Sequence, residues 1–254
     1  LYNQASGLPT NFVLSIASTP DGAVWLGTMN GLARVLNGRI RTYTETDGLP
    51  DNAIYGLYAD RAGALWIATG GGLSHFDGRT FTNYSEANGL VSNYVTVVLE
   101  DRHGTVWIGT YDKGLNLMKD GTLYTLKKSD GLSHDGILSL HEDDAGVLWV
   151  GTYGGGLNRI ENGVISFVTS RDGLFNDKVS QILEDENRNL WISSNKGLYT
   201  VSRDEIARFA AGEITRITSH LYDRSDGLLS QEFTGGIQRD HRDGCPRLQN
   251  PPGG

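Results

Sequence analysis

The sequence predicts an all-β fold, a β-propeller built from four-stranded antiparallel blades. Three observations predict it. Every tryptophan falls on one ladder, a second ladder of Gly-Leu pairs keeps step with it, and each interval holds four short apolar runs separated by Gly, Asp and Asn. A repeat of about 40–45 residues with four strands in each unit is typical of propeller blades.

The two ladders share the same spacing. The tryptophans lie 41 or 42 residues apart, at Trp25, Trp66, Trp107, Trp149 and Trp191. The pairs that open the units are Gly7-Leu8, Gly48-Leu49, Gly89-Leu90, Gly131-Leu132 and Gly173-Leu174, and a sixth pair, Gly227-Leu228, follows. Blades that stack radially need a large apolar side chain between neighbours, so we expect the indoles to be packing residues.

Each unit has the same internal order. An Asn or Asp stands four residues after the first Gly, and we expect these to be structural: Asn11, Asn52, Asn93, Asp135 and Asp177. An apolar strand, an Asp-x-x-Gly turn, the Trp strand, a second Gly-Leu pair and two further strands follow. No crossover helix fits within the connections, which excludes parallel βαβ units.

The repeat also gives the boundaries. We expect propeller repeats over residues 1–238, with blade units of about 8–48, 49–89, 90–131, 132–173 and 174–227, and a non-matching tail over 239–254. Residues 1–8 match the end of a unit, so we expect the outermost strand of a preceding blade there. Five complete blades with half-units at each end form either a small closed ring or an arc of a larger one.

The fifth unit carries an insertion over residues 202–212. Ser202-Arg203-Asp204-Glu205 has the pattern of a capping box, and Ile206, Phe209 and Ala210 mark an apolar stripe. Gly212 is suited to ending a helix. We expect a short helix that covers the outer part of the blade.

Composition excludes several classes of function. The chain has 254 residues, one Cys and a net charge of −8. A single Cys excludes a disulfide framework, and the acidic balance argues against nucleic acid as a partner. The apolar runs are too short to span a bilayer, and no signal peptide pattern opens the sequence, although this does not establish a cytoplasmic location.

A search for catalytic or metal-binding motifs finds none that fits. The six His are dispersed, and the Asp-x-x-Gly turns lack the ligands of a calcium loop, so we expect their Asp side chains to cap the turn backbone. Gly70-Gly71-Gly72 and Gly154-Gly155-Gly156 precede strands rather than a helix, which argues against a phosphate loop. We therefore expect no metal, no cofactor and no catalytic residue.

The repeat resembles the two-component regulator propeller family. The resemblance is carried by runs such as Asp47-Gly48-Leu49-Pro50-Asp51-Asn52 and Leu148-Trp149-Val150-Gly151-Thr152. Three residues depart from the family pattern. Arg188 stands where the other units have Gly in the turn, and Asp135 and Asp177 stand where Asn is usual.

The resemblance implies a non-enzymatic sensor region of a bacterial receptor. Such propellers form the periplasmic part of inner-membrane histidine kinases, hybrid kinases or diguanylate cyclases, and those of the gut-bacterial type detect oligosaccharides. Any phosphorelay then belongs to the parent protein. We expect an oligosaccharide ligand and dimerisation within the parent receptor, with no nucleic acid and no membrane contact by this segment itself.

Propeller topology suggests where a ligand would bind. The loops that precede each inner strand and the loops between second and third strands emerge at the same end of the ring, where rigid strands hold them. From their variable positions we select as ligand contacts Tyr111, Asp112, Lys113, Tyr153, Asn195 and Lys196. Aromatic rings stack on sugars, and the polar groups hydrogen-bond hydroxyls or carboxylates.

Two alternatives remain. A protein-interaction or dimerisation platform would expose an apolar patch on the rim or on one face. A propeller lyase or glycosidase would bring acid and base groups together at the channel mouth, for example Asp112, Lys113, His134 and Asp135.

Overall fold

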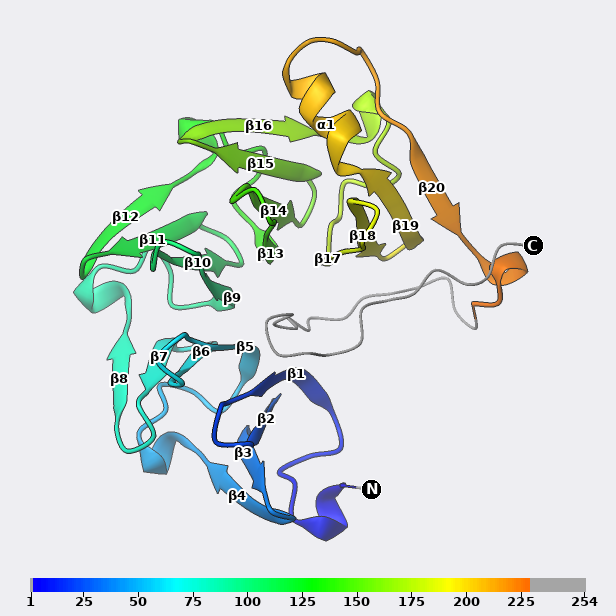
Figure 1. Cartoon of the computed structure of the whole chain (residues 1–254). Helices are drawn as coiled ribbons and strands as arrows, with labels where there is room; N and C mark the ends of the chain where they lie inside the picture. Colours follow the sequence, from blue (N-terminus) through cyan, green and yellow to red (C-terminus); the bar gives the residue numbers. More distant parts are fainter. Residues whose placement is uncertain (1, 229–254) are drawn as a thin grey trace.

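The structure, a computed structural model, describes residues 2–228. Within them, twenty strands form five four-stranded antiparallel sheets, each with its strands in chain order from inside to outside. The sheets are arranged as the blades of a propeller (Figure 1). The prediction of an all-β propeller with four-stranded blades is therefore confirmed.

The strands of the first three blades are β1 (Val13–Ser18), β2 (Val24–Thr28), β3 (Gly31–Leu36) and β4 (Arg39–Tyr43); β5 (Ile54–Ala59), β6 (Leu65–Thr69), β7 (Gly72–Phe76) and β8 (Phe81–Tyr84); and β9 (Val95–Glu100), β10 (Val106–Thr110), β11 (Leu115–Lys119) and β12 (Thr122–Leu126). Those of the last two are β13 (Ile137–Glu142), β14 (Leu148–Thr152), β15 (Leu157–Glu161) and β16 (Val164–Val168); and β17 (Gln181–Glu184), β18 (Asn189–Ser194), β19 (Gly197–Ser202) and β20 (Ser219–Tyr222).

The five blades form an open arc in the described part of the chain. Their inner strands pack in succession, β1 against β5, β5 against β9, β9 against β13 and β13 against β17. The first and fifth blades stand apart, on either side of the open part of the arc (Figure 1). All four strands of the fifth blade come from residues 181–222, so the amino-terminal segment does not complete that blade.

The amino-terminal segment also differs from expectation. No strand precedes β1 within residues 2–12, and a 3-10 helix, η1 (Gln4–Ser6), occupies the stretch expected to be an outer strand. The reason lies in the register of the repeat. Residues 2–8 match Tyr84 to Leu90, which is the end of one outer strand and the connection after it, rather than the strand itself.

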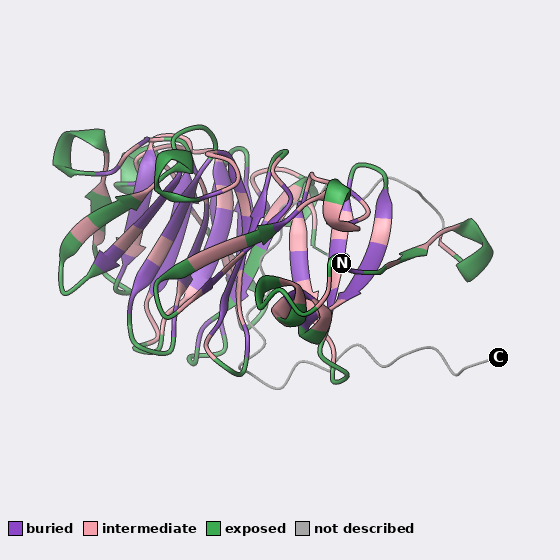
Figure 2. Cartoon of the chain, turned by 90° about the horizontal axis from the view of Figure 1, so that it is seen from above, coloured by how far each residue is buried: buried purple, intermediate pink, exposed green. Residues whose placement is uncertain are grey.

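The core lies between the blades rather than in one central cluster. Residues of the first three strands are mostly buried, whereas the outer strands are largely exposed (Figure 2). Trp25 illustrates the packing, because its ring centroid lies 5.8 Å from that of Tyr43 in its own blade and 5.7 Å from that of Phe76 in the next. The prediction that the indoles pack between blades is confirmed at this position.

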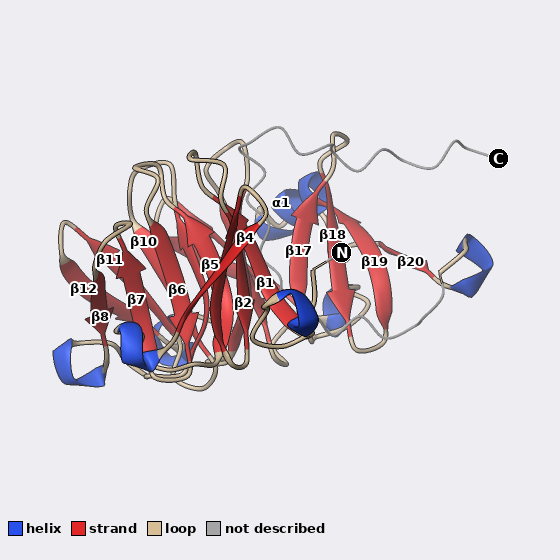
Figure 3. Ribbon diagram, turned by 90° about the horizontal axis from the view of Figure 1, so that it is seen from below, coloured by secondary structure: helices blue, strands red, loops and turns tan. Residues whose placement is uncertain are grey.

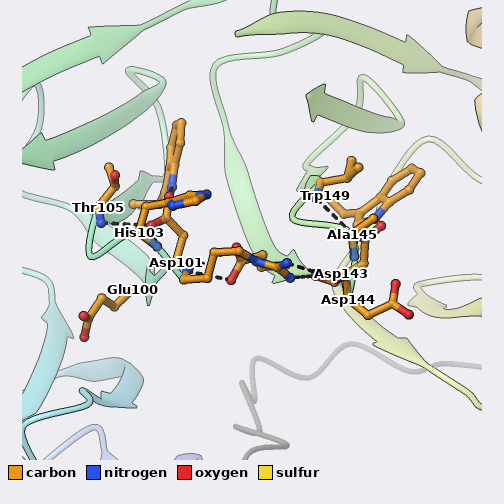
Figure 4. A network of polar contacts seen from close by, with 12 residues as sticks. Glu100, Asp101, His103, Thr105, Asp143, Asp144, Ala145 and Trp149 are labelled. Carbon is orange, nitrogen blue, oxygen red and sulfur yellow. Dashed lines mark hydrogen bonds and ion pairs between the residues drawn. The ribbon is translucent and has the colours of Figure 1, made fainter. Parts of the chain in front are cut away.

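In the third, fourth and fifth blades, the Asp of the Asp-x-x-Gly turn holds both the turn and the tryptophan. Asp101 Oδ1 accepts the backbone N–H groups of His103 and Thr105 at 2.8 and 2.9 Å, and its Oδ2 accepts the Trp107 indole N–H at 2.9 Å. Figure 4 shows this turn beside the equivalent turn of Asp143, which binds Trp149 in the same way at 2.9 Å. Capping of the turn backbone by Asp is thus confirmed, and the indole bond is an additional function of the same carboxylate.

Arginines join successive turns across the blade boundaries. Arg61 donates to the backbone carbonyls of Asp101 and Arg102 in the next blade, at 3.0 and 2.6 Å. Arg102 in turn donates to the carbonyls of Asp143 and Asp144. These bonds repeat one blade apart and fix the spacing of the blades at this end of the molecule.

The boundary between the fourth and fifth blades is joined in a different way. Asp144 occupies the position that Arg61 and Arg102 have in the preceding blades. The positively charged side chain at this boundary comes instead from the helix α1 (Arg203–Ala210). Arg203 is buried and lies 2.7 Å from both Asp144 and Glu184. The helix therefore ties two blades together as well as covering their outer edge.

The apolar stripe expected on this helix is only partly correct. Ile206 is buried in the core of the last two blades and Phe209 packs against that core, but Ala210 is exposed. The helix is short, so Ala210 lies in its last turn, beyond the surface that the blades cover. Arg203, read from the sequence only as part of the capping box, is one of the two buried residues of the helix.

Short 3-10 helices lie in the connections between blades: η2 (Glu45–Asp47), η3 (Glu86–Asn88), η4 (Lys128–Asp130) and η5 (Ser170–Asp172). Equivalent helices precede the first blade, η1, and follow the fifth, η6 (Arg224–Asp226). Figure 3 shows helices near one end of the strands, while α1 lies near the other. We call the end with the inter-blade connections the connection face and the end with the Asp turns the turn face.

Candidate functional site

The connection face is built by loops that bind one another across blade boundaries. The N–H of Gly31 donates to the Asn52 carbonyl at 2.8 Å, and the N–H of Gly114 donates to the Asp135 carbonyl at 2.7 Å. Each bond joins a loop between second and third strands to the connection that precedes the next inner strand. Both sets of loops therefore lie at one end of the molecule, and the strands hold them in fixed positions.

Glycine permits this close approach. A Cβ on Gly71 would lie 2.4 Å from the Pro50 carbonyl oxygen, and one on Gly155 would lie 2.7 Å from the Cβ of His134. Side chains are excluded at these positions because the neighbouring connection fills the space. Gly72 and Gly156 lead into strands β7 and β15, so these glycine runs form no helix terminus for a phosphate.

Four tyrosines from three blades lie in a continuous row on this face. Neighbouring ring centroids are 5.0 Å apart for Tyr55 and Tyr94, 5.0 Å for Tyr94 and Tyr111, and 5.7 Å for Tyr111 and Tyr153. We call these four residues the tyrosine row. Tyr94, Tyr111 and Tyr153 are 37%, 41% and 46% exposed, so the row is an ordered aromatic surface open to solvent.

Lys178 of the fifth blade extends the row by one residue. Its ammonium nitrogen lies 5.0 Å from the centroid of the Tyr153 ring, within the distance of a cation–π contact. The row and this lysine together cross from the second blade to the fifth. A ligand lying along them would therefore contact four blades.

The phenols of Tyr55 and Tyr111 have a pKa raised above its ordinary value. Burial, followed by the neighbouring Tyr94 hydroxyl, raises the pKa of Tyr55. The charge of an ionised Tyr153 would oppose that of Tyr111, and this raises the pKa of Tyr111. Tyr55 and Tyr111 consequently offer uncharged hydroxyl groups, which both donate and accept hydrogen bonds.

The structure brings together only some of the residues selected from the sequence. Tyr111 and Tyr153 are neighbours in the row. Asp112 accepts a hydrogen bond from Ser92 Oγ at 2.8 Å, and Lys113 pairs with Glu86 at 2.8 Å, on the side of the connection η3. The Lys113 pair lowers the pKa of Glu86 and raises that of Lys113.

Asn195 and Lys196 lie on the β18–β19 loop of the fifth blade. Asn195 Oδ1 accepts a hydrogen bond from Asn176 Nδ2 at 3.0 Å. Lys196 is exposed, and its backbone N–H donates to Ser194 Oγ at 3.1 Å. Within residues 2–228, no ring contact or hydrogen bond links this pair to the tyrosine row.

The groups required by the enzymatic alternative are engaged with different partners. Asp112 binds Ser92, Lys113 binds Glu86, and Asp135 Oδ1 accepts the backbone N–H of Lys128 at 2.7 Å. His134 Nδ1 accepts the N–H of Gly136 at 2.8 Å. In the described part of the chain these four side chains do not form one acid–base set, and no cluster of three or more His, Cys, Asp or Glu has the arrangement of a metal site.

Sequence reasoning missed Tyr55, Tyr94 and Lys178. A signal was present for two of them, since the residue after the repeated Asn or Asp varies freely between units, as Phe12, Ala53, Tyr94, Gly136 and Lys178. At this position Tyr94 contacts the ring of Tyr111 in its own blade, and Lys178 contacts that of Tyr153 in the preceding blade. Tyr55 carries no such signal, because it lies within strand β5 and resembles any strand residue.

Comparison with protein families identifies the repeat. The two-component regulator propeller model matches residues 7–30, 48–71, 89–112, 131–154 and 173–196, one match in each blade. The five blades contain two-component regulator propeller repeats. Each match covers the inner strand, the Asp turn and the Trp strand of its blade. The third match includes Tyr94 and Tyr111, and the fourth includes Tyr153.

Solved structures share the fold of these propeller repeats. The extracellular domain of the putative hybrid two-component system BT3049 from B. thetaiotaomicron has a TM-score of 0.72 and 23% identity over 87% of this chain, and the chain spans only 32% of that domain. A catalytically inactive virginiamycin B lyase from Staphylococcus aureus has a TM-score of 0.69 and 19% identity, over 92% of this chain and 76% of the lyase.

A third structure, PorZ from Porphyromonas gingivalis, has a TM-score of 0.66 and 18% identity over 90% of this chain and 37% of PorZ. No curated protein sequence matches the chain. Within the described residues, no helix of the propeller is long and apolar enough to cross a bilayer.

Proposed function

We propose that this chain is the ligand-sensing part of an extracytoplasmic, periplasmic propeller in a bacterial two-component receptor, and that it binds a glycan-derived ligand without chemical change. The observation that carries the proposal is the tyrosine row. Exposed aromatic rings held in fixed positions present apolar edges and hydroxyl groups side by side, which suits the mixed surface of a sugar. The extracellular location of the BT3049 domain supports the placement outside the cytoplasm.

The position of the row suggests how ligand binding would change the conformation of the rest of a receptor. Its residues come from the second, third and fourth blades, and the angle between blades decides how closely the rings lie. A ligand that contacts several blades favours the arc curvature that fits it best, and a receptor dimer would transmit that shift to its output domain. Phosphorelay activity would belong to that output domain.

Calorimetry against a panel of neutral and charged oligosaccharides tests the proposal. Tyr111→Ala and Tyr153→Ala should each weaken binding about tenfold or more, since each removes a central ring of the row. Tyr124→Ala is the matched control, because Tyr124 is also exposed but lies on the outer strand β12. If the Tyr111 and Tyr153 variants bind as tightly as the Tyr124 variant, the site is elsewhere.

A further inference from the structure

The chemistry around the tyrosine row indicates one class of ligand, and this inference rests on the proposed function above. We infer that the row binds an oligosaccharide that carries a carboxylate, with Lys178 as the residue that pairs with the acid group. Some hydrogen-bonding groups beside the row are already engaged within the protein, and others remain for a ligand.

The carboxylates near the row are occupied by the protein. Asp51 accepts the backbone N–H of Ala53 at 2.7 Å, and Asp112 accepts the Ser92 hydroxyl. Asp135 accepts the N–H of Lys128 at 2.7 Å, while Asp177 accepts the N–H and the hydroxyl of Ser170. Each acceptor therefore stabilises a connection loop.

The hydrogen-bond donors beside the row differ from these carboxylates, because one cation is not paired within the protein. Among residues 2–228, Lys178 has no ion pair with a carboxylate, and its ammonium group lies over the Tyr153 ring. A cation–π contact engages one side of the ammonium group and leaves N–H donors on its other side for a ligand. The other cation beside the row, Lys113, is already paired with Glu86. Lys178 is thus the cation that remains for a ligand at this end of the row.

His134 supplies a second donor. It lies between the loops of Tyr111 and Tyr153, since a Cβ on Gly136 would contact both its ring and the Tyr111 carbonyl, and a Cβ on Gly155 would contact its Cβ. Because Nδ1 accepts the Gly136 N–H, the proton of the neutral ring is on Nε2. That nitrogen donates, and it therefore favours an oxygen acceptor.

Lys178 and His134 thus both lie beside the Tyr153 end of the row. A carboxylate gains most from such a set, because hydrogen bonds to a charged acceptor are stronger than those to a neutral hydroxyl. The chain's net charge of −8 opposes an anion at long range. At physiological salt this repulsion is screened beyond about 8 Å, so local contacts decide the affinity.

Binding of matched sugars tests the inference on the 254-residue chain. The probes are an α-1,4-linked galacturonate trisaccharide and the galactose trisaccharide of the same linkage, measured by calorimetry. We expect the acidic sugar to bind about tenfold more tightly, the size of one charge-assisted hydrogen bond. Equal affinity for the two sugars, or a preference for the neutral one, overturns the inference while leaving a sugar-binding propeller intact.

Variants then assign the preference to one residue. Lys178→Met keeps the aliphatic stem over Tyr153 and should remove the preference for the acidic sugar without weakening the neutral one, and Lys178→Arg should restore it. Lys119→Met, at the turn-face end of β11, is the control. If the Lys119 and Lys178 variants behave alike, Lys178 does not bind the carboxylate of the sugar. If neither sugar binds and a wider neutral panel also fails, the proposed function itself is wrong.

Discussion

Five equivalent side-chain oxygens hold the connections between blades. Oδ1 of each repeated Asn or Asp accepts the first backbone N–H of the preceding 3-10 helix, at 2.9 Å for Asn11, 3.0 Å for Asn52, 2.7 Å for Asn93, 2.7 Å for Asp135 and 2.6 Å for Asp177. The bond requires an acceptor and no donor. The two Asp therefore act as the three Asn do, and they do not weaken the repeat.

This equivalence predicts a pair of opposite outcomes at one position. Asp135→Asn should change the free energy of unfolding by less than about 0.5 kcal/mol, because the amide oxygen replaces the carboxylate oxygen. Asp135→Ala should lower it by about 1 kcal/mol, as for the loss of a helix cap. Urea denaturation measures both. A larger loss for the Asn variant would mean that the charge, rather than the acceptor, is what the connection needs.

The first blade uses two residues where the third, fourth and fifth use one Asp. Trp25 Nε1 donates to Thr19 Oγ1 at 2.9 Å, and the Thr19 hydroxyl donates to Asp21 at 2.6 Å. This bond, with further help from Ala23 N–H and Arg34, lowers the pKa of Asp21 from its ordinary 3.8 to about 2. The folded protein therefore holds the ionised form more strongly than the unfolded chain does.

A pH dependence follows from that shift. The stabilising contribution of Asp21 is fully present above pH 4 and is lost as the pH falls from 3.8 to about 2. Asp21→Asn should therefore be less stable than the parent at pH 6, and the difference should shrink as the pH approaches 2. Denaturant titrations at several pH values test this. A difference that stays constant with pH would assign the effect to packing rather than to ionisation.

At the scale of an element, each Asp turn needs one residue with a left-handed backbone conformation, that is, a positive φ. Gly22, Gly63, Gly104 and Gly146 occupy this position with φ between 80° and 85°, and Arg188 adopts φ 63° in the fifth blade. A side chain in this region costs roughly 1–2 kcal/mol. The ion pair of Arg188 with Asp204 is exposed on both sides and offsets little of that cost.

Arg188→Gly should accordingly stabilise the propeller by roughly 0.5–1 kcal/mol, after the added flexibility of the unfolded chain is counted. Gly22→Ala is the converse change, since a Cβ there meets no atom within 4 Å and only the backbone is strained. It should destabilise by about 1 kcal/mol. Thermal unfolding followed by circular dichroism compares the two. Shifts in the same direction would show that the turn does not require glycine.

The helix α1 is held by its buried arginine. Arg203 is 4% exposed and binds acids of two blades, so Arg203→Ala leaves the buried Asp143 with one fewer partner and should cost about 3–5 kcal/mol. Arg208→Ala, which breaks an exposed pair with Glu213, is the control and should cost less than about 1 kcal/mol. Equal losses would mean that α1 is not fastened to the fourth blade.

At the scale of the whole molecule, the sequence predicted the features that follow from the spacing of the repeats. It did not predict the features that depend on contacts between loops far apart in the chain. The Trp and Gly-Leu ladders determine blade number, strand order and the face on which the loops emerge. The neighbours of Tyr111 could not be read in the same way, because Tyr94 lies in another loop of its blade and Tyr153 in the next blade. Arg203 was missed for a related reason, since a charged residue at the start of an amphipathic helix is usually exposed.

The central claim is that ligands bind on the connection face, along the tyrosine row. Hydrogen–deuterium exchange of the chain with and without a bound oligosaccharide tests it most directly. The account predicts slower exchange in the segments around Tyr94, Tyr111, Tyr153 and Lys178, with unchanged exchange in the Asp turns at the opposite end. Protection confined to the turn face or to the outer strands would contradict it.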